Sequence, residues 1–251
     1  MRPFVGASGA AFEHAGQRLT KRCRNAIEQA TWLRMASVLP LVDGVRCVEV
    51  YAVDANSYTM EHITGHLATV EPSTQVTRTL YAQVNKWREI PPTNNATWDS
   101  YLERLREHCD DANSETLRRA LAYITASEPF QASFNHGDLT YENVLIQPDN
   151  AYCLIDPNHS PGLYQSFILD LGKMLQSTHT DYHAAFNTNT GINLTMHDQT
   201  LCDLLRNAGL YHQALLACLT HIIRLAKYRR DEISKVEALA QRLLGELKCS
   251  S

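Results

Sequence analysis

The middle of the chain holds the residue types that phosphoryl transfer requires, at a spacing that suits this chemistry. The segment reads FNHGDLTYENVLI from Phe134 and ends in YCLID at Asp156. Its polar residues form the pattern His136-x-Asp138-x4-Asn143, followed by apolar residues and Asp156. Phosphoryl transfer needs one carboxylate to orient the attacking hydroxyl, and an amide and a further carboxylate to hold magnesium. Asp138, Asn143 and Asp156 are therefore candidate catalytic residues.

A short hairpin is predicted to connect Asn143 to Asp156. Residues 144–147 and 152–155 are apolar and suit two strands, and Pro148-Asp-Asn150 suits the turn between them. A match to H-x-D-x4-N also arises by chance in some chains of this length. The two strands and the carboxylate after the second strand favour the catalytic interpretation.

This spacing resembles the catalytic loop of the protein-kinase-like superfamily. HGDLTYEN is most similar to the aminoglycoside phosphotransferase branch, which includes small-molecule kinases. The resemblance implies an α+β, bilobal fold with a small N-terminal antiparallel sheet lobe and a larger helical C-terminal lobe. It also implies ATP or GTP as phosphoryl donor and Mg²⁺ held by Asn143 and Asp156. Asp138 would orient the hydroxyl of a small-molecule acceptor and take its proton.

The same resemblance implies a lysine and a glutamate near the N-terminus. Residues 18–23 (RLTKRC) suit a short strand, and residues 26–38 suit a helix. Lys21 would contact the nucleotide phosphates, and Glu28 would hold Lys21 as an ion pair. The apolar face of the helix is expected at Ile27, Ala30 and Leu33. In the alternative interpretation, Lys21 and Glu28 are ordinary solvated charges.

A second hairpin is predicted to lead into the linker between the lobes. Residues 45–53 and 57–63 suit two strands joined by a short turn. The segment MEHITG resembles the inter-lobe linker of aminoglycoside-phosphotransferase-like enzymes. The resemblance implies that the backbone near Glu61, His62 and Ile63 binds the adenine. Before these strands, the glycine-containing residues 5–11 could form a turn over the phosphates or a flexible start to the lobe.

Two further segments resemble a bacterial subgroup of these phosphotransferases that is often linked with surface-polysaccharide pathways. Residues 166–177 suit a helix with the pattern D-x-x-K-x-x-Q, in which Asp170 would support the catalytic loop and Lys173 would face the site or a nearby acid. An amphipathic helix with one salt bridge is the alternative. His221 and Arg224 match an H-x-x-R helix of the subgroup, and no chemical role is expected for them.

The chain departs from protein kinases after Asp156. Pro157-Asn158 follows this residue instead of Phe-Gly, and no Ala-Pro-Glu follows. A regulatory activation segment is therefore not expected. A protein kinase or a nucleotide transferase with the same fold remains an alternative, as does a nucleotide-binding pseudoenzyme that acts through partners. The complete set of Asp138, Asn143 and Asp156 argues against the pseudoenzyme, and the glycine-poor N-terminus argues for it.

The acceptor is the least defined part of the prediction. A sugar, an amino sugar or another small hydroxyl compound is the first choice, by resemblance. An acidic cleft would favour a cationic acceptor. The acids that could contribute to such a cleft are Asp110, Asp111, Glu115 and Asp181.

Composition places the chain among globular proteins. Its 251 residues are 44% hydrophobic and carry a formal charge of −4, so a basic nucleic-acid surface is not indicated. The sequence contains no run of about 18 apolar residues, and its seven cysteines include no C-x2-C pair. A cytoplasmic protein with reduced thiols is expected. Strand-like segments precede residue 64 and helical ones follow, which predicts a nucleotide-binding lobe at 1–64 and a helical lobe at 65–251. The oligomeric state is not predicted.

Overall fold

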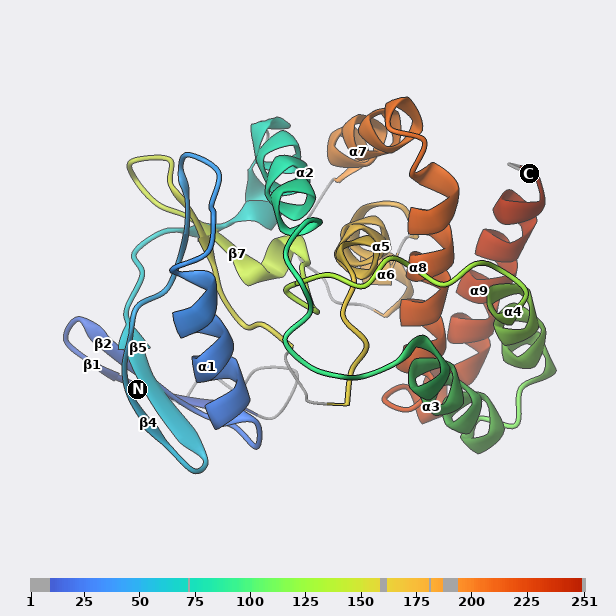
Figure 1. Cartoon of the computed structure of the whole chain (residues 1–251), viewed down its shortest axis with the longest axis horizontal. Coiled ribbons are helices and arrows are strands. Elements are labelled where there is room, and N and C mark those ends of the chain that lie inside the picture. Colours follow the sequence, from blue (N-terminus) through green and yellow to red (C-terminus); the bar gives the residue numbers. More distant parts are fainter. Residues whose placement is uncertain (1–9, 72, 159–161, 181, 187–193, 250–251) are drawn as a thin grey trace.

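The chain forms a small sheet-containing part and a larger helical part, which lie at opposite ends of the view in Figure 1. The computed structural model describes residues 10–71, 73–158, 162–180, 182–186 and 194–249. The expected α+β fold with an antiparallel sheet lobe and a helical lobe is confirmed. Residues 1–9, and with them most of the expected glycine-containing turn, lie outside the described residues.

An antiparallel sheet of four strands forms the N-terminal part. Its order is β1-β2-β5-β4. The strands are β1 (Ala11–Ala15), β2 (Arg18–Arg22), β4 (Val50–Asp54) and β5 (Ser57–Glu61). Helix α1 (Ala26–Ala36) packs against β4 and β5. The expected strand at 18–23, the helix after it and the β4–β5 hairpin are all present.

A second sheet carries the residues that follow the catalytic loop. Its order is β3-β8-β7-β6. The strands are β3 (Val45–Cys47), β6 (His66–Leu67), β7 (Val144–Ile146) and β8 (Tyr152–Leu154). β7 and β8 form the predicted antiparallel hairpin. The predicted single strand at 45–53 is wrong, because it divides into β3, which pairs in parallel with β8, and β4, which stays in the first sheet.

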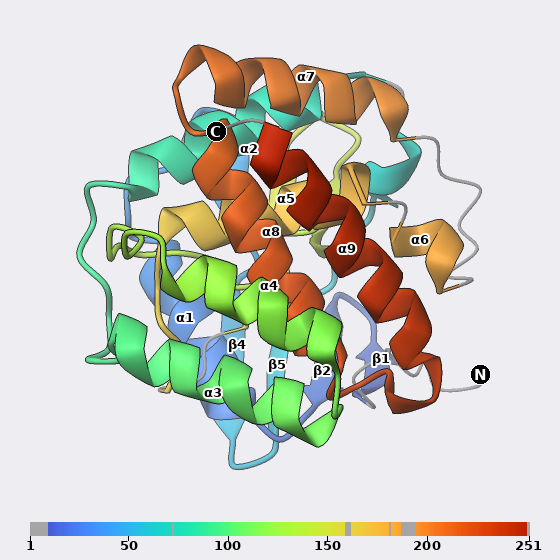
Figure 2. The ribbon, with the colours of Figure 1, turned by 90° about the vertical axis from the view of Figure 1, so that its right-hand side faces the viewer.

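Most of the remaining chain is helical, as expected. Helix α5 lies among the other helices of this part, with α8 beside it (Figures 1 and 2). No helix in the described ranges is long and apolar enough to cross a membrane. The long helices are α2 (Gln75–Trp87), α3 (Trp98–Asp111), α4 (Glu115–Thr125), α5 (Phe167–Thr178), α7 (Thr195–Asn207), α8 (Tyr211–Leu225) and α9 (Ile233–Cys249). Shorter ones are η1 (Ala68–Val70), η2 (Tyr141–Asn143), α6 (Tyr182–Ala185) and η3 (Arg230–Glu232).

A glycine allows α5 and α8 to approach closely. A Cβ atom at Gly172 in α5 would lie 2.6 Å from the Cβ and the carbonyl carbon of Ala217 in α8. Both residues are buried, so neither helix backbone can move aside without disturbing the core. The position of α5 within the helical part therefore depends on the absence of a side chain at residue 172.

We predict that Gly172→Ala destabilises the protein although alanine favours helix. The added methyl overpacks the α5–α8 contact, which should lower the unfolding free energy by about 1–3 kcal/mol. Gly245→Ala in α9 is the matched control, because a Cβ there meets nothing within 4 Å. This control should raise stability by about 0.5–1 kcal/mol. Urea denaturation of both variants checks the prediction, and equal stabilisation by both would contradict it.

A partly buried cluster of one histidine and two carboxylates joins the C-terminal end of α5 to α7 and α9. His179 Nδ1 lies 3.0 Å from Asp198, and His179 Nε2 lies 2.9 Å from Glu246. The Tyr211 hydroxyl also donates to Glu246. Hydrogen bonds to Asp198, Cys202 and Glu246 outweigh burial and raise the pKa of His179 to about 11. The imidazolium lowers the pKa of both carboxyls, against the effect of their burial.

We predict that this cluster stabilises the fold in a limited pH window. The folded pKa of His179 exceeds its usual value of 6.5, so its contribution is complete below pH 6.5 and is lost as the pH rises toward 11. The two carboxyls contribute only above about pH 4. His179→Gln should therefore cost about 2 kcal/mol near pH 6 and less at pH 9.

Thermal and urea unfolding of wild type and variant at both pH values measure this difference. His66→Gln is the control, because His66 pairs with Glu71 at the surface and should change stability little. An equal cost of His179→Gln at pH 6 and pH 9 would contradict the prediction.

Candidate active site

The predicted catalytic loop is held in place by a buried carboxylate from α5. The backbone amides of His136 and Gly137 donate to Asp170 at 2.6 and 2.8 Å. Asp170 is fully buried, so these two bonds replace the water that an ionised carboxylate requires. Burial raises the pKa of Asp170 to about 7, and the two amides oppose this rise. The contact agrees with the supporting role that the resemblance implies for Asp170.

Gly137 has a left-handed backbone conformation, and it lies against the backbone of Asn158. Its φ is +78°, and a Cβ atom there would lie 2.2 Å from the carbonyl oxygen of Asn158. The amide of Asn158 donates in turn to the carbonyl of His136 at 3.0 Å. The loop after Asp156 thus packs directly on the loop that precedes Asp138, which only glycine allows.

His136 has a packing role within the same loop. Its ring is fully buried and lies edge-on to Trp32 of α1, with centroids 4.9 Å apart. Burial lowers the pKa of His136 to about 4, so the ring is neutral at pH 7. Trp32 Nε1 also donates to the carbonyl of Asn135 at 2.8 Å. Helix α1 of the sheet lobe is therefore in direct contact with the catalytic loop.

Asp138 lies between a lysine and an amide. Lys173 Nζ is 2.8 Å from Asp138 Oδ1, and Asn143 Nδ2 donates to Asp138 Oδ2 at 3.1 Å. Burial tends to raise the pKa of Asp138, but the charge and hydrogen bond of Lys173 lower it below its usual value. The carboxylate is therefore ionised at neutral pH. Lys173 faces a nearby acid, as expected, and that acid is Asp138.

The β7–β8 hairpin brings Asp156 next to Asn143. Val144 pairs with Leu154, and the amide of Ile155 donates to the carbonyl of Asn143 at 3.0 Å. Asp156 follows with φ +58°, a left-handed conformation in which aspartate is tolerated better than most residues. Its carboxylate forms an ion pair with Lys21 from β2. Residues far apart in the sequence therefore meet at one place.

Lys21 is buried, and its partner on α1 is Gln29 instead of the expected Glu28. Its side chain is 2% exposed, and its ammonium donates to Gln29 Oε1 at 3.0 Å. The hydroxyl of Tyr58 donates to the same oxygen at 3.2 Å. Burial lowers the pKa of Lys21 to about 8, which leaves the ammonium charged at neutral pH. No ion pair joins Lys21 to Glu28 among the described residues.

Gln29 reaches Lys21, and Glu28 does not, because of the face of α1 that is buried. Gln29 lies on the buried face with Trp32 and Leu33, whereas the expected face residue Ile27 is 51% exposed. Glu28 is only partly buried, and the Lys21 ammonium donates to Gln29 instead. The large side chain of Trp32, packed on Phe134 and His136, sets the rotation of the helix. Gln29 is thus a site residue that the apolar pattern alone did not identify.

Among the three linker residues expected at the adenine, one has a backbone amide without a hydrogen bond in the described part of the chain. The amide of Glu61 donates to the carbonyl of Glu49, and the amide of His62 donates to Gln17, both at 2.9 Å. The carboxylate of Glu61 is held by both Nη atoms of Arg46, at 2.7 and 2.6 Å. Within the described ranges, the amide of Ile63 forms no hydrogen bond. Of the three expected residues, Ile63 is therefore the one whose N–H remains open.

Several solved structures with the same fold are small-molecule kinases. No protein-family model matches the chain, and no curated protein matches it. Aminoglycoside phosphotransferase APH(2'')-IIa, in a complex with streptomycin and ATP, is 12% identical with a TM-score of 0.65, over 96% of this chain and 90% of that one. The macrolide 2'-phosphotransferase MphH of Brachybacterium faecium is 14% identical (TM-score 0.56; 96% and 91% covered). The ethanolamine kinase of Plasmodium vivax is 10% identical with a TM-score of 0.56, over 96% of this chain and 81% of that one.

At these identities the comparison establishes the fold, and it agrees with the resemblance on which the site was predicted. The chain has the bilobal fold of the protein-kinase-like small-molecule kinases.

Proposed function

We propose that this protein is an ATP-dependent phosphotransferase that moves the γ-phosphoryl group to a hydroxyl of a small molecule. One observation supports this most strongly. Lys21 of the sheet lobe meets Asp156, while Asp138 and Asn143 contact each other beside them. A cation for phosphates, oxygen ligands for a metal and a carboxylate for the acceptor are the groups that phosphoryl transfer requires.

The proposed metal-binding role of Asn143 and Asp156 fits the oxygen atoms that their side chains offer. The Nδ2 of Asn143 is used by Asp138, both through its carboxylate and through its carbonyl at 2.8 Å. This leaves the amide oxygen, a hard ligand of the kind that magnesium prefers. Asp156 supplies a carboxylate on the neighbouring chain segment. A bound magnesium would neutralise phosphate charge, and Asp156 would then divide its contacts between the metal and Lys21.

The state of Asp138 favours hydroxyl orientation over early proton removal. With a lowered pKa it is a weak base, so it accepts a hydrogen bond from the acceptor hydroxyl without ionising it. In a loose transition state the hydroxyl becomes acidic late, and the proton then passes to Asp138. Lys173 balances the charge of Asp138 before this step.

The nucleotide base is assigned to the linker. The open amide of Ile63 can donate to a ring nitrogen of adenine, and the backbone of residues 60–64 would lie along the base. The chain has no described contact that separates ATP from GTP. Three solved structures with this fold are an ADP-bound aminoglycoside phosphotransferase, the complex of APH(2'')-IIa with streptomycin and ATP, and an ethanolamine kinase. The compounds in these descriptions support a nucleotide and a small acceptor for this chain. A sugar or amino sugar was the acceptor expected from the resemblance.

A nucleotide-binding pseudoenzyme is the second candidate. The observation in its favour is Gln29, because a neutral amide holds Lys21 less firmly than the carboxylate expected at Glu28. Turnover separates the two proposals, since only the kinase releases ADP in the presence of an acceptor.

We predict that Asp138→Asn lowers kcat by about 10²- to 10⁴-fold, because the amide cannot take the proton. The nucleotide dissociation constant should change by less than about threefold, since Asp138 faces the acceptor. Acceptor-stimulated ADP release and equilibrium binding of an ATP analogue with Mg²⁺ measure the two effects. Asp149→Asn, in the exposed turn of the same hairpin, is the control and should behave as wild type. Undiminished turnover of Asp138→Asn would exclude the role.

We also predict that Gln29, and not Glu28, positions Lys21 for the nucleotide. Gln29→Ala removes the acceptor of the Lys21 bond, which should weaken ATP binding by about 5- to 20-fold. Glu28→Ala is the matched control one residue away and should bind ATP as wild type does. Calorimetric titration with the ATP analogue checks both variants. A larger effect of Glu28→Ala than of Gln29→Ala would show that the original assignment was right.

A further inference from the structure

A basic cavity lies between α3 and α8. It has a volume of about 70 Å³ and receives Arg104 and His108 from α3, Arg224 from α8 and Lys227 just after α8. Asn158 and Leu163, from the segment after Asp156, complete one side. No aspartate or glutamate is among the described residues that line it. The cavity therefore presents cationic groups without acids between them.

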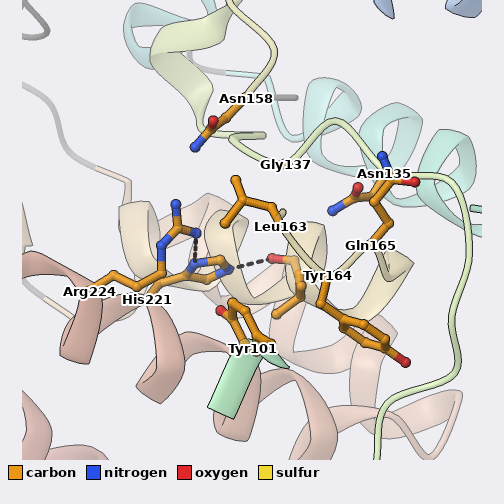
Figure 3. Close-up of a pocket in the computed structure, with 10 residues that line it drawn as sticks. Tyr101, Asn135, Gly137, Asn158, Leu163, Tyr164, Gln165, His221 and Arg224 are labelled. Atoms are coloured by element: carbon orange, nitrogen blue, oxygen red, sulfur yellow. Dashed lines mark hydrogen bonds between the residues drawn. The ribbon is translucent and has the colours of Figure 1, made fainter. Parts of the chain in front are cut away.

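The basic cavity lies beside the predicted catalytic loop. A narrower hollow is lined by Gly137, Asn135 and His221, and it shares Arg224 and Asn158 with the basic cavity. Gly137 is the residue before Asp138. In Figure 3 the guanidinium of Arg224 points toward the side chain of Asn158, with Gly137 nearby. Arg224 is also close enough to Asp138 for its charge to act on that carboxylate, so a molecule bound at Arg224 would extend toward Asp138.

The cations at this cavity lack carboxylate partners. Arg224 Nη1 lies 3.3 Å from His221 Nδ1, and Arg104 donates to the carbonyl of Gly162 at 2.9 Å. Neither arginine, nor Lys227, forms an ion pair with a carboxylate in the part of the chain that the structure describes. Elsewhere in the molecule most arginines are paired, such as Arg118 with Asp110 and Arg230 with Asp111.

The charges act together at the cavity. Burial and the positive charges of Lys227, Arg224 and Arg104 lower the pKa of His108 to about 4, although Asp111 opposes them. Arg224 also contributes to the lowered pKa of Asp138. A neutral His108 can still donate one hydrogen bond, while the arginines offer planar donors that match carboxylate and phosphate oxygens.

From this geometry we infer that the acceptor is anionic: a small hydroxyl compound that carries a carboxylate or phosphate group bound at Arg224, Arg104 and Lys227. The inference rests on the proposed kinase function and names its substrate class. With a volume of about 70 Å³, the cavity has room for one such group. The hydroxyl end would lie toward Asp138.

Asp110, Asp111 and Glu115, the described acids among those named for a cationic acceptor, do not form an acidic cleft. Asp110 and Asp111 are exposed at the end of α3 and pair with Arg118 and Arg230. Glu115 lies near Arg118 at 3.8 Å. Asp181 lies outside the described residues. The side of the site beyond Asp138 is thus positive, which favours an anionic acceptor over an amino sugar.

The test compares acceptors that share a carbon skeleton and differ in one neutral, cationic or anionic substituent. Glucose, glucosamine, glucuronate and glucose 6-phosphate form one set, and glycerol, glycerate and glycerol 3-phosphate form another. Acceptor-stimulated ADP release gives kcat/KM for each with wild type, Arg224→Gln and Arg104→Gln. Arg119→Gln, an exposed arginine of α4, is the matched control. Thermal unfolding and ATP-analogue binding establish that each variant is folded.

We expect kcat/KM to favour the anionic member of a set by about 10- to 100-fold, the worth of one or two hydrogen bonds to a charged group. Arg224→Gln and Arg104→Gln should each remove most of this preference, chiefly through KM, and Arg119→Gln should retain it. The carboxylate and phosphate members show which anion is bound better. A preference for the neutral or amino compound, or an anion preference that survives in both variants, would overturn the inference.

A second readout separates this inference from the proposed function. Calorimetric titration of the anionic and neutral compounds onto the protein without nucleotide measures binding alone. Anion binding that is lost in Arg224→Gln supports the basic cavity even if no acceptor is phosphorylated, in which case the kinase proposal fails by itself. ADP release that depends on Asp138 but shows no charge preference supports the kinase and rejects the anionic acceptor.

Discussion

A buried carboxylate from α5 determines the path of the predicted catalytic loop. Asp170 is fully buried, so it must accept the two amides of His136 and Gly137 if it is to carry a charge. One helical turn further along α5, Lys173 reaches Asp138. The same helix thus fixes both the backbone of the loop and the charge of its carboxylate. The position of α5 in turn depends on its close packing against α8 at Gly172.

The sheet lobe is fixed to this arrangement by α1. Trp32 donates to Asn135 and stacks against Phe134 at 5.5 Å between ring centroids. Since Gln29 lies on the same face of α1, the tryptophan also determines which residue reaches Lys21. Lys21 then extends from β2 to Asp156. The two halves of the site are therefore aligned by buried aromatic contacts on one side and by an ion pair on the other.

The sequence was sufficient for the parts of the site that are close together in the chain. The β7–β8 hairpin could be predicted because alternating apolar segments and a turn determine it locally. The resemblance of residues 166–177 to a D-x-x-K-x-x-Q helix likewise implied the contacts that Asp170 and Lys173 make with the loop. The buried face of α1 could not be predicted, because Ile27 and Trp32 compete for the core and only the distant Phe134 and His136 decide between them. The basic cavity was missed for a related reason, as Arg104 and Arg224 belong to helices that meet only in the folded chain.

The parallel pairing of β3 with β8 links the two lobes in a further way. Val45–Cys47 and Tyr152–Leu154 are about a hundred residues apart, so closing this contact orders a long loop of chain before any hydrogen bond is gained. During synthesis, β3 leaves the ribosome long before its partner exists, and it must wait unpaired with its apolar side chains Val45 and Cys47 uncovered. The hairpin that carries Asp156 gains its edge strand only when both halves of the chain are present. The two lobes therefore cannot fold independently of each other. A fragment that ends at residue 64 would contain β3 but lack its partner β8.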